Sequence, residues 1–288
     1  MKAMIHLDIG ASHLRATLKP ATPGWGSRVA RALQTKHKSV EETQAVTLTE
    51  IASWASGATR ADNLSAQLDA AAQALQALRA RHPAPLDGCR LVVRTGMGTS
   101  CVGIAPMDFS SPLARSEPQL RAVARALSQE ALGMDAAGHE VRWRIQADQA
   151  HLCVVTLESA LVAGLQALAQ AQRMRLASCQ PALVALMDNE LEHSRRQRDA
   201  RTLVWTELGP TGRRHGAMSF FRLVNGSAVH AWRTVTSVPL AAGDPWLQPA
   251  LDRFLIASGA DVDERIVPLV WPAHATDASI PAAMELAA

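Results

Sequence analysis

Apolar and polar residues alternate at the start of the chain with the two-residue period of a β-strand. The alternation covers residues 5–9 and returns over residues 14–18. Between them, Gly10-Ala11-Ser12 has the composition of a tight turn. The simplest structure for this stretch is a strand, a turn and an antiparallel return strand.

A similar order of elements is predicted after residue 200. Residues 203–207 form a predicted strand, residues 209–216 a glycine-bearing turn and residues 217–224 a return strand. Asn225-Gly226 is a strong hairpin signal before a third strand over residues 227–235. The repeated pattern, separated by helical sequence, predicts two related α/β lobes, each with a mixed sheet. We expect a ligand to bind in the cleft between the two turns.

Helical periodicity appears in four other segments. They cover residues 64–81, 117–132 and 158–172, and a fourth helix is expected to open at Pro181. Short strands are predicted at residues 28–35, 90–94, 101–105, 141–145, 152–155 and 266–270. Residues 255–260 read as a strand end with a glycine turn, and residues 272–288 as a loosely held tail.

The glycines of Gly96-Met97-Gly98-Thr99-Ser100 invite comparison with a phosphate-binding loop. The run lacks the lysine of that loop and leads into a predicted strand, not a helix. A plain hairpin turn is therefore the favoured interpretation. Ser100 and the adjacent Cys101 are candidate nucleophiles without an implied histidine partner, and structural roles are favoured for both.

Composition narrows the function classes. The net charge of +3 is too small to indicate a nucleic-acid partner, and tyrosine is absent. The four cysteines form no CxxC pair, which favours a reducing compartment. No apolar run reaches membrane-spanning length and the first residues show no signal-peptide pattern, so we expect a cytoplasmic protein without a transmembrane segment of its own.

The first turn carries candidate binding chemistry. Gly10 lets a ligand approach the backbone, and the N–H groups of the turn with the Ser12 hydroxyl suit phosphate oxygens. Asp8, at the strand end, is placed to hold a metal-bound water beside such a phosphate. An ordinary hairpin in which Asp8 caps the turn is the alternative. The ten histidines form no HExxH or similar motif, and no GxSxG elbow occurs.

These residues resemble the superfamily of actin, heat-shock chaperones and sugar kinases. The run from Leu7 to Arg15 looks like its first phosphate motif, and the run from Glu207 to Gly212 lies where its second belongs. Residues 255–260 resemble a reduced adenosine motif. The resemblance implies an α/β, actin-like (ribonuclease H-like) fold of two lobes with mixed sheets, an interlobe cleft and a reduced second lobe.

The middle of the chain looks most like the PilM and GspL families, which are actin-like assembly proteins of type IV pilus and type II secretion systems. Residues 153–189 carry this similarity as a strand, a helix, a further strand and a helix that connects the lobes. We expect a first lobe over residues 1–180 with an inserted subdomain at about 60–155. The second, reduced lobe is expected over residues 181–271.

The resemblance also implies a nucleotide site for ATP with magnesium. Its residues would be Asp8, which would also serve the metal, together with Gly10, Ala11, Ser12, Glu207, Gly209, Thr211 and Gly259. The second motif departs from the family pattern, because Glu207 stands for the usual aspartate and Pro210 removes a backbone donor. Arg213 and Arg214 add bulk, and little chain lies between residues 235 and 255. We therefore expect weak or absent ATP binding.

Two functions follow from these observations. The first is a non-catalytic assembly scaffold, a pseudo-ATPase at the cytoplasmic face of the inner membrane. It would bind the cytoplasmic tail of a membrane protein, and its other partners would be an assembly ATPase or a second copy of itself. The apolar residues Ile104, Met107, Phe109 and Leu113 are the predicted peptide-binding surface. The alternative is an ATP-dependent enzyme, either an ATPase or a small-molecule kinase, that uses Asp8 and Glu207 around magnesium and ATP.

Overall fold

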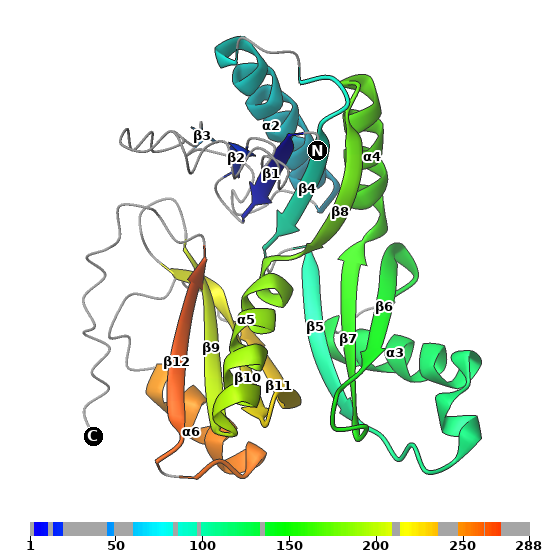
Figure 1. Ribbon diagram of the computed structural model, residues 1–288, viewed down its shortest axis with the longest axis vertical. Coiled ribbons are helices and arrows are strands. Elements are labelled where there is room, and N and C mark those ends of the chain that lie inside the picture. The colour runs from blue at the N-terminus through cyan, green and yellow to red at the C-terminus, as the bar shows by residue number, and fades with distance from the viewer. Residues whose placement is uncertain are drawn as a thin grey trace, which may run out of the picture.

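The structure is a computed structural model in which the chain folds around three β-sheets (Figure 1). It describes residues 3–10, 14–19, 45–48, 60–82, 86–96, 99–132, 136–208, 214–235, 247–261 and 263–271. The sheets have five, four and three strands. Among the described residues, no helix combines the length and the apolar character that crossing a membrane requires.

The first lobe is built on the five-stranded sheet, in the order β3-β2-β1-β4-β8. Strand β1 pairs antiparallel with β2 and parallel with β4, which in turn pairs parallel with β8. The strands are β1 (Met4–Ile9), β2 (Leu14–Lys19), β3 (Ala45–Leu48), β4 (Arg90–Thr95) and β8 (Arg175–Pro181). Helices α2 (Arg60–Arg81) and α4 (Ser159–Ala171) pack against the sheet (Figure 1).

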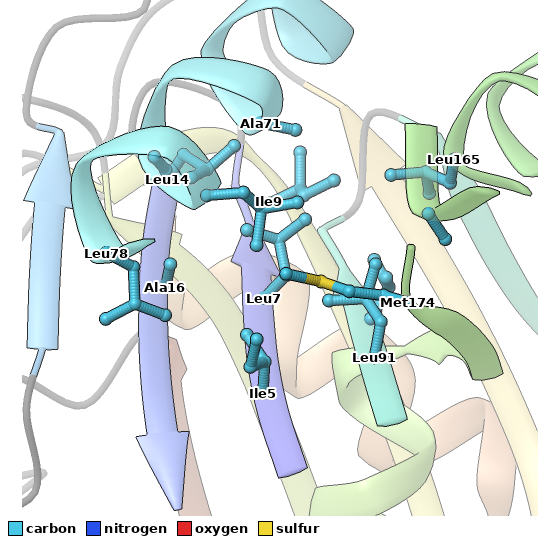
Figure 2. Packing of buried hydrophobic residues seen from close by; sticks show 14 of the residues in the cluster. Ile5, Leu7, Ile9, Leu14, Ala16, Ala71, Leu78, Leu91, Leu165 and Met174 are labelled. Atoms are coloured by element: carbon cyan, nitrogen blue, oxygen red, sulfur yellow. The ribbon is translucent and has the colours of Figure 1, made fainter. Parts of the chain in front are cut away.

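The core of this lobe follows from the alternation along β1. Ile5, Leu7 and Ile9 are at most 1% exposed and lie in a row on one side of the strand (Figure 2). They meet Ala71 and Leu78 from α2. Further along the sheet, buried residues from β4, α4 and the segment before β8 continue the cluster: Leu91, Leu165 and Met174. Burying this apolar face is the main stabilisation of the lobe.

The second lobe repeats the pairing pattern of the first. Its sheet has the order β11-β10-β9-β12, with β9 antiparallel to β10 and parallel to β12. The strands are β9 (Ala200–Leu208), β10 (Arg214–Val224), β11 (Ser227–Val235) and β12 (Arg265–Trp271). Because β1 has the same two kinds of neighbour, residues 4–18 and 203–224 form equivalent units in separate sheets, and this prediction is confirmed.

Two helices cover opposite faces of the second sheet. Helix α5 (Ala182–Gln197) places Leu183 and Met187 in a cluster with Trp205 and Phe221. Helix α6 (Leu247–Ser258) places Leu251 and Phe254 in a separate cluster with Val204, Met218 and Phe220. Since neighbouring residues of β9 belong to different clusters, this strand is buried on both sides.

The third sheet is inserted between β4 and β8. It has the order β5-β7-β6 and carries helix α3 (Glu117–Leu132) on one face. Its strands are β5 (Ser100–Pro106), β6 (His139–Ile145) and β7 (His151–Glu158), with short 3-10 helices η2 (Pro112–Arg115) and η3 (Ala136–Gly138). Val102 and Ile104 of β5 point away from α3 and join the second lobe's core.

The four predicted helices are confirmed, and α5 begins directly after Pro181. Several strand predictions change. Residues 255–258 are the last turn of α6, not a strand end. An apolar run of this length fits a buried helix face as well as a strand, and tertiary packing selects the helix. The predicted strand over residues 28–35 and the tail over 272–288 lie outside the described residues.

The expected boundary of the inserted subdomain was about residue 60. In the structure, α2 and β4 pack within the five-stranded sheet of the first lobe, and the separate three-stranded sheet comprises residues 100–158. The predicted hairpin at residues 96–100 also differs, because β4 and β5 belong to different sheets. The glycine-containing segment therefore carries the chain from the first lobe into the insertion.

A buried arginine joins α5 to the second sheet. The side chain of Arg201 is 2% exposed and donates to Glu190 at 2.9 Å and to Asp199 at 2.5 Å. A third bond, of 2.7 Å, runs from its Nη2 to Oε1 of Gln197. These partners satisfy a charge whose burial would otherwise carry a large desolvation cost.

Replacing this arginine should destabilise the protein. We expect Arg201→Met to lower the free energy of unfolding by about 3 kcal/mol, because two partly buried carboxylates lose their partner. Urea unfolding followed by circular dichroism measures the change. The matched control is Arg265→Met, at the exposed residue that faces Arg201 in the register of β12 and β9. An equal loss in both variants would contradict this role for the ion pair.

Candidate functional site

The candidate site lies where β1, β4 and β9 end, and we call it the interlobe junction: Asp8, Arg94, Gly96 and Glu207. Gly96 continues the first sheet beyond β4, because its N–H donates to the carbonyl of Ile9 at 2.8 Å. Glu207 is the next-to-last residue of β9 in the second sheet. The junction therefore brings together residues of both predicted phosphate motifs, which are distant in sequence.

Asp8 is bound by Arg94 through both oxygens of its carboxylate. Nε of Arg94 donates to Oδ1 at 2.6 Å and Nη2 donates to Oδ2 at 2.7 Å. The register explains the contact, because Asp8 lies opposite Arg94 on β4. The aspartate side chain is 7% exposed and the arginine side chain 31% exposed. Such a two-pronged pair in a partly dry site is strong and fixes both side chains.

A second arginine flanks the same aspartate. Arg15 of β2 lies opposite Asp8 on the other side of β1. The carboxylate of Asp8 is therefore placed between arginine positions on two neighbouring strands. A water bound to magnesium at Asp8 would have to compete with Arg94 for the carboxylate oxygens. The residues present thus fit an internal ion pair better than the first-motif role in ATP binding.

Glu207 is fully buried and lies against the backbone of the first lobe. A methyl group placed on Gly96 would lie 2.4 Å from Oε1 and 2.5 Å from Oε2 of Glu207. Contacts this short do not occur, so the carboxylate occupies the space that only a glycine leaves open. A side chain at position 96 would therefore require the Glu207 carboxylate to move.

The residues around Gly96 complete a structural turn. The hydroxyl of Ser100 donates to the carbonyl of Gly96 at 2.7 Å, and the N–H of Glu158 donates to the carbonyl of Thr99 at 3.1 Å. Burial raises the pKa of the Cys101 thiol, which keeps the thiol protonated and a poor nucleophile. These contacts favour the structural interpretation of Ser100 and Cys101 over a nucleophilic one.

Two other cysteines are equally unsuited to nucleophilic chemistry. Burial raises the pKa of Cys153 to about 11 and that of Cys179 to about 12. In the described part of the chain, no group of three or more histidine, cysteine or acidic residues is arranged to hold a metal ion.

The structure separates Gly259 from Glu207, another of the predicted site residues. Gly259 follows α6 with a φ of +66°, a conformation that favours glycine at the end of a helix. Its neighbour there is Arg222, which lies opposite Thr202 near the start of β9. Glu207 lies five residues further along the same strand, a distance of roughly 16 Å. Gly259 therefore caps a helix at the other end of the sheet.

Other predicted nucleotide residues have limited structural support. Gly10 is buried at the end of β1, directly beside the junction. Ala11, Ser12, Gly209 and Thr211 lie outside the described residues. The cofactor assignment of these five residues stays a prediction.

The predicted peptide-binding residues divide between core and surface. Ile104 and Phe109 are 8% and 5% exposed and belong to two different core clusters, and Met107 packs against the cluster of Phe109. Leu113 is 78% exposed. The apolar segment thus packs back onto the insertion, because Phe109 fills the space between α3 and the sheet. Ile104 and Phe109 are not available as exposed anchors.

Arg94 is the residue that the sequence interpretation missed. Arg94 belongs to no sequence motif, and the sequence predicts only a short strand over residues 90–94. The strand register would have identified Arg94. A parallel pairing of β1 with β4 that starts at Met4 and Arg90 places Arg94 opposite Asp8. Sequence alternation alone does not give that register.

The fold is shared with known structures at low sequence identity. A Bacteroides thetaiotaomicron protein described as having an actin-like ATPase fold and unknown function gives a TM-score of 0.51 at 9% identity, covering 96% of this chain and 84% of that protein. The PilM-PilN type IV pilus biogenesis complex gives 0.46 at 13% identity, with 88% and 67% coverage. No protein-family model and no curated protein matches the sequence.

A third structure is the cytoplasmic domain of EpsL, an inner membrane component of the type II secretion system of Vibrio cholerae. It gives a TM-score of 0.48 at 8% identity and covers 93% of this chain and 82% of that domain. The similarity to the Bacteroides protein supports the architecture derived from the sheets. This chain has an actin-like fold.

Adding one methyl group at Gly96 should disturb the junction. We expect Gly96→Ala to lower the free energy of unfolding by about 1–3 kcal/mol, because the buried Glu207 carboxylate must move. Gly138→Ala is the control, since nothing lies within 4 Å of a methyl group there. Denaturant unfolding gives the stability of Gly96→Ala, of Gly138→Ala, of Glu207→Ala and of the double variant that combines Gly96→Ala with Glu207→Ala. The cycle of the variants at positions 96 and 207 gives the coupling energy between these two residues. Additive effects of Gly96→Ala and Glu207→Ala would show that the two residues are not coupled energetically, which would contradict this role for their contact.

Acid should destabilise the first lobe partly through His6. Burial, followed by the charges of Lys19 and Arg94, lowers the pKa of His6 below its ordinary value of 6.5. Below pH 6.5 the unfolded chain therefore binds a proton more readily than the folded one, and stability falls as the pH decreases. We expect His6→Asn to weaken this decrease between about pH 5 and 6.5 in urea unfolding. An unchanged slope would contradict the assignment.

Proposed function

We propose that this protein is a non-catalytic, actin-like assembly scaffold whose nucleotide site no longer supports ATP hydrolysis. The observation that carries the proposal is the pairing of both Asp8 oxygens with Arg94. In the resemblance described above, Asp8 is the carboxylate that would serve magnesium. Here the same carboxylate stabilises the sheet and is held away from metal chemistry.

The second carboxylate supports the same proposal. Glu207 is fully buried and its oxygens lie against the backbone at Gly96. A general base or a metal ligand needs access to water or substrate, and a carboxylate in close contact with the backbone has little. The two acidic residues of the interlobe junction thus contribute to cohesion between strands and lobes instead of phosphate chemistry.

The assembly role itself rests on the resemblance of residues 153–189 to the PilM and GspL families. On this proposal the protein works at the cytoplasmic face of the inner membrane in a pilus or secretion platform. Its partners are the cytoplasmic tails of membrane proteins, with an assembly ATPase or a second copy of the chain as further candidates. An ATP-dependent enzyme is the competing function.

Calorimetric titration with magnesium and ATP tests the loss of nucleotide chemistry. We expect no saturable binding at millimolar nucleotide and no phosphate release above background, because Asp8 is engaged by Arg94. Any residual binding should disappear in Gly10→Val, whose side chain would fill the space beside the first turn. Leu113→Ala is an exposed control that should change neither result.

If the protein is instead an ATP-dependent enzyme, the opposite results are expected. An enzyme would bind the nucleotide saturably, release phosphate and lose both properties in Asp8→Asn. Binding that survives Gly10→Val would place the nucleotide elsewhere in the molecule. Unfolding curves of each variant distinguish loss of binding from loss of the fold.

A further inference from the structure

Strand β6 is a free edge of the inserted sheet. It pairs antiparallel with β7, and within the described segments no other strand pairs with its outer side (Figure 1). The opposite edge strand, β5, packs its Val102 and Ile104 into the core of the second lobe. The two edges of the sheet therefore differ, and the outer edge at β6 is open for main-chain pairing.

The direction of the unused backbone groups follows from the register. The N–H of Gln146 donates to the carbonyl of His151 at 2.8 Å, toward β7. In an antiparallel pair the direction alternates with each residue. The N–H and C=O groups of Val141, Trp143 and Ile145 therefore point to the free edge. They form a row of donors and acceptors at the spacing that an added strand requires.

A groove runs beside this edge, between β6 and α3. Its volume is about 410 Å³, and its lining includes Arg121, Arg125, His139, Arg142 and Trp143. The guanidinium of Arg121 lies 6.0 Å from the ring centroid of Trp143, over the ring. Since Trp143 also packs against the apolar cluster of the insertion, its ring forms a firm wall of the groove.

Arginines lie on both faces of the sheet at this edge, and they exceed the acidic residues on the α3 face. Arg121 and Arg125 come from α3 on one face, and Arg142 and Arg144 are exposed residues of β6. On the α3 face, Glu117 lies 2.5 Å from Arg121 in an exposed pair. On the other face, Glu140 lies 3.3 Å from Arg142 in an exposed pair, and Asp188 and Glu192 of α5 line a groove with Arg144. Exposed pairs of this kind hold their partners weakly.

The remaining two arginines are less engaged. Arg144 reaches Asp188 of α5 only at 3.8 Å. Arg125 has no ion pair with any residue of the described part of the chain. A strand added at β6 would alternate its side chains between the two faces and would meet arginines on each. The positive charge on the α3 face therefore complements acidic residues at alternate positions of an extended segment.

We propose that β6 is the docking edge for an acidic, extended segment of a partner protein, which adds to the inserted sheet as a fourth strand. This inference deepens the assembly function proposed above, and rests on it, by naming the chemistry of the partner. Main-chain hydrogen bonds to residues 141–145 hold the segment. Arg121, Arg125, Arg142 and Arg144 select its acidic side chains.

The observations favour a peptide over other anions. Trp143 packs against the apolar cluster of the insertion and Arg121 lies over its ring, so the ring is part of the groove wall beside β6. A phosphate group or a lipid head group would use the arginines but not the row of backbone groups on β6. A merely protective role for the arginines, to keep edges from aggregating, predicts no saturable binding at all.

Fluorescence anisotropy with a labelled synthetic peptide tests the docking edge. The probe is a decapeptide in which glutamate alternates with valine and threonine, titrated with the full chain. We expect saturable binding that weakens about tenfold or more in Arg121→Glu with Arg125→Glu, because like charges then face the peptide. Arg253→Glu, at an exposed arginine of α6, is the matched control and should leave the affinity unchanged. Circular dichroism verifies that each variant is folded.

A second peptide separates strand addition from simple charge attraction. It has the same sequence with alternate backbone nitrogens methylated, so its charge is kept while its donors are removed. We expect the peptide methylated on its docking side to lose binding. Equal binding of methylated and unmethylated peptides, or equal binding to wild type and the double variant, would overturn the proposal.

Two further probes address the other classes of ligand. Anionic phospholipid vesicles or a single-stranded oligonucleotide that bind through Arg121 and Arg125, when the peptide does not, would also overturn it. These results are independent of the nucleotide titration. Failure of the peptide to bind, with ATP binding absent, would reject the docking edge and leave the scaffold proposal standing.

Discussion

The close contact between Gly96 and Glu207 sets the arrangement of the two lobes. Gly96 extends the first sheet by its hydrogen bond to Ile9, and Glu207 is the next-to-last residue of β9, a central strand of the second sheet. The carboxylate fits only because position 96 has no side chain. The two lobes therefore approach each other closely at this point, and the insertion leaves the first lobe from the same place.

The ion pair beside this contact determines what the junction can do. A carboxylate at the end of β1 is well placed to serve a metal-bound phosphate, but its charge is balanced here by an arginine on the adjacent strand. Removing Arg94 would leave Asp8 almost fully buried without its partner, so the pair is stabilising in a way that a loosely held catalytic carboxylate is not. The pair therefore holds the end of β1 to the end of β4.

Much of the fold could be predicted from periodicity, and the reasons for the failures are physical. The alternation at Ile5, Leu7 and Ile9 identified a half-buried strand, and helix patterns located α2, α3, α4 and α5 correctly. Periodicity cannot tell a short apolar run in a helix from one in a strand, which explains the error at residues 255–258. It also does not say whether an apolar connection is exposed, and Phe109 proved to be core.

The site was harder to predict because it depends on register. Asp8 and Glu207 were recognised as candidates from their motifs, and both lie at the junction. Arg94 was not, since an arginine in a short strand has no meaning until its neighbour across the sheet is known. The role of a carboxylate depends on its partner more than on its own motif, so the ion pair of Asp8 with Arg94 could not be predicted, and the nucleotide assignment stays a prediction.

The two edges of the inserted sheet also differ in the partners of their strands. The edge strand β5 is committed to the second lobe through Val102 and Ile104, while the other edge has no such neighbour in the described chain. An edge with unused backbone groups normally needs protection against unwanted pairing, and charges supply it. Arginines repel a basic strand and give a neutral strand no electrostatic attraction, but they attract an acidic strand. Protection against aggregation and selection of a partner are therefore compatible properties of one edge.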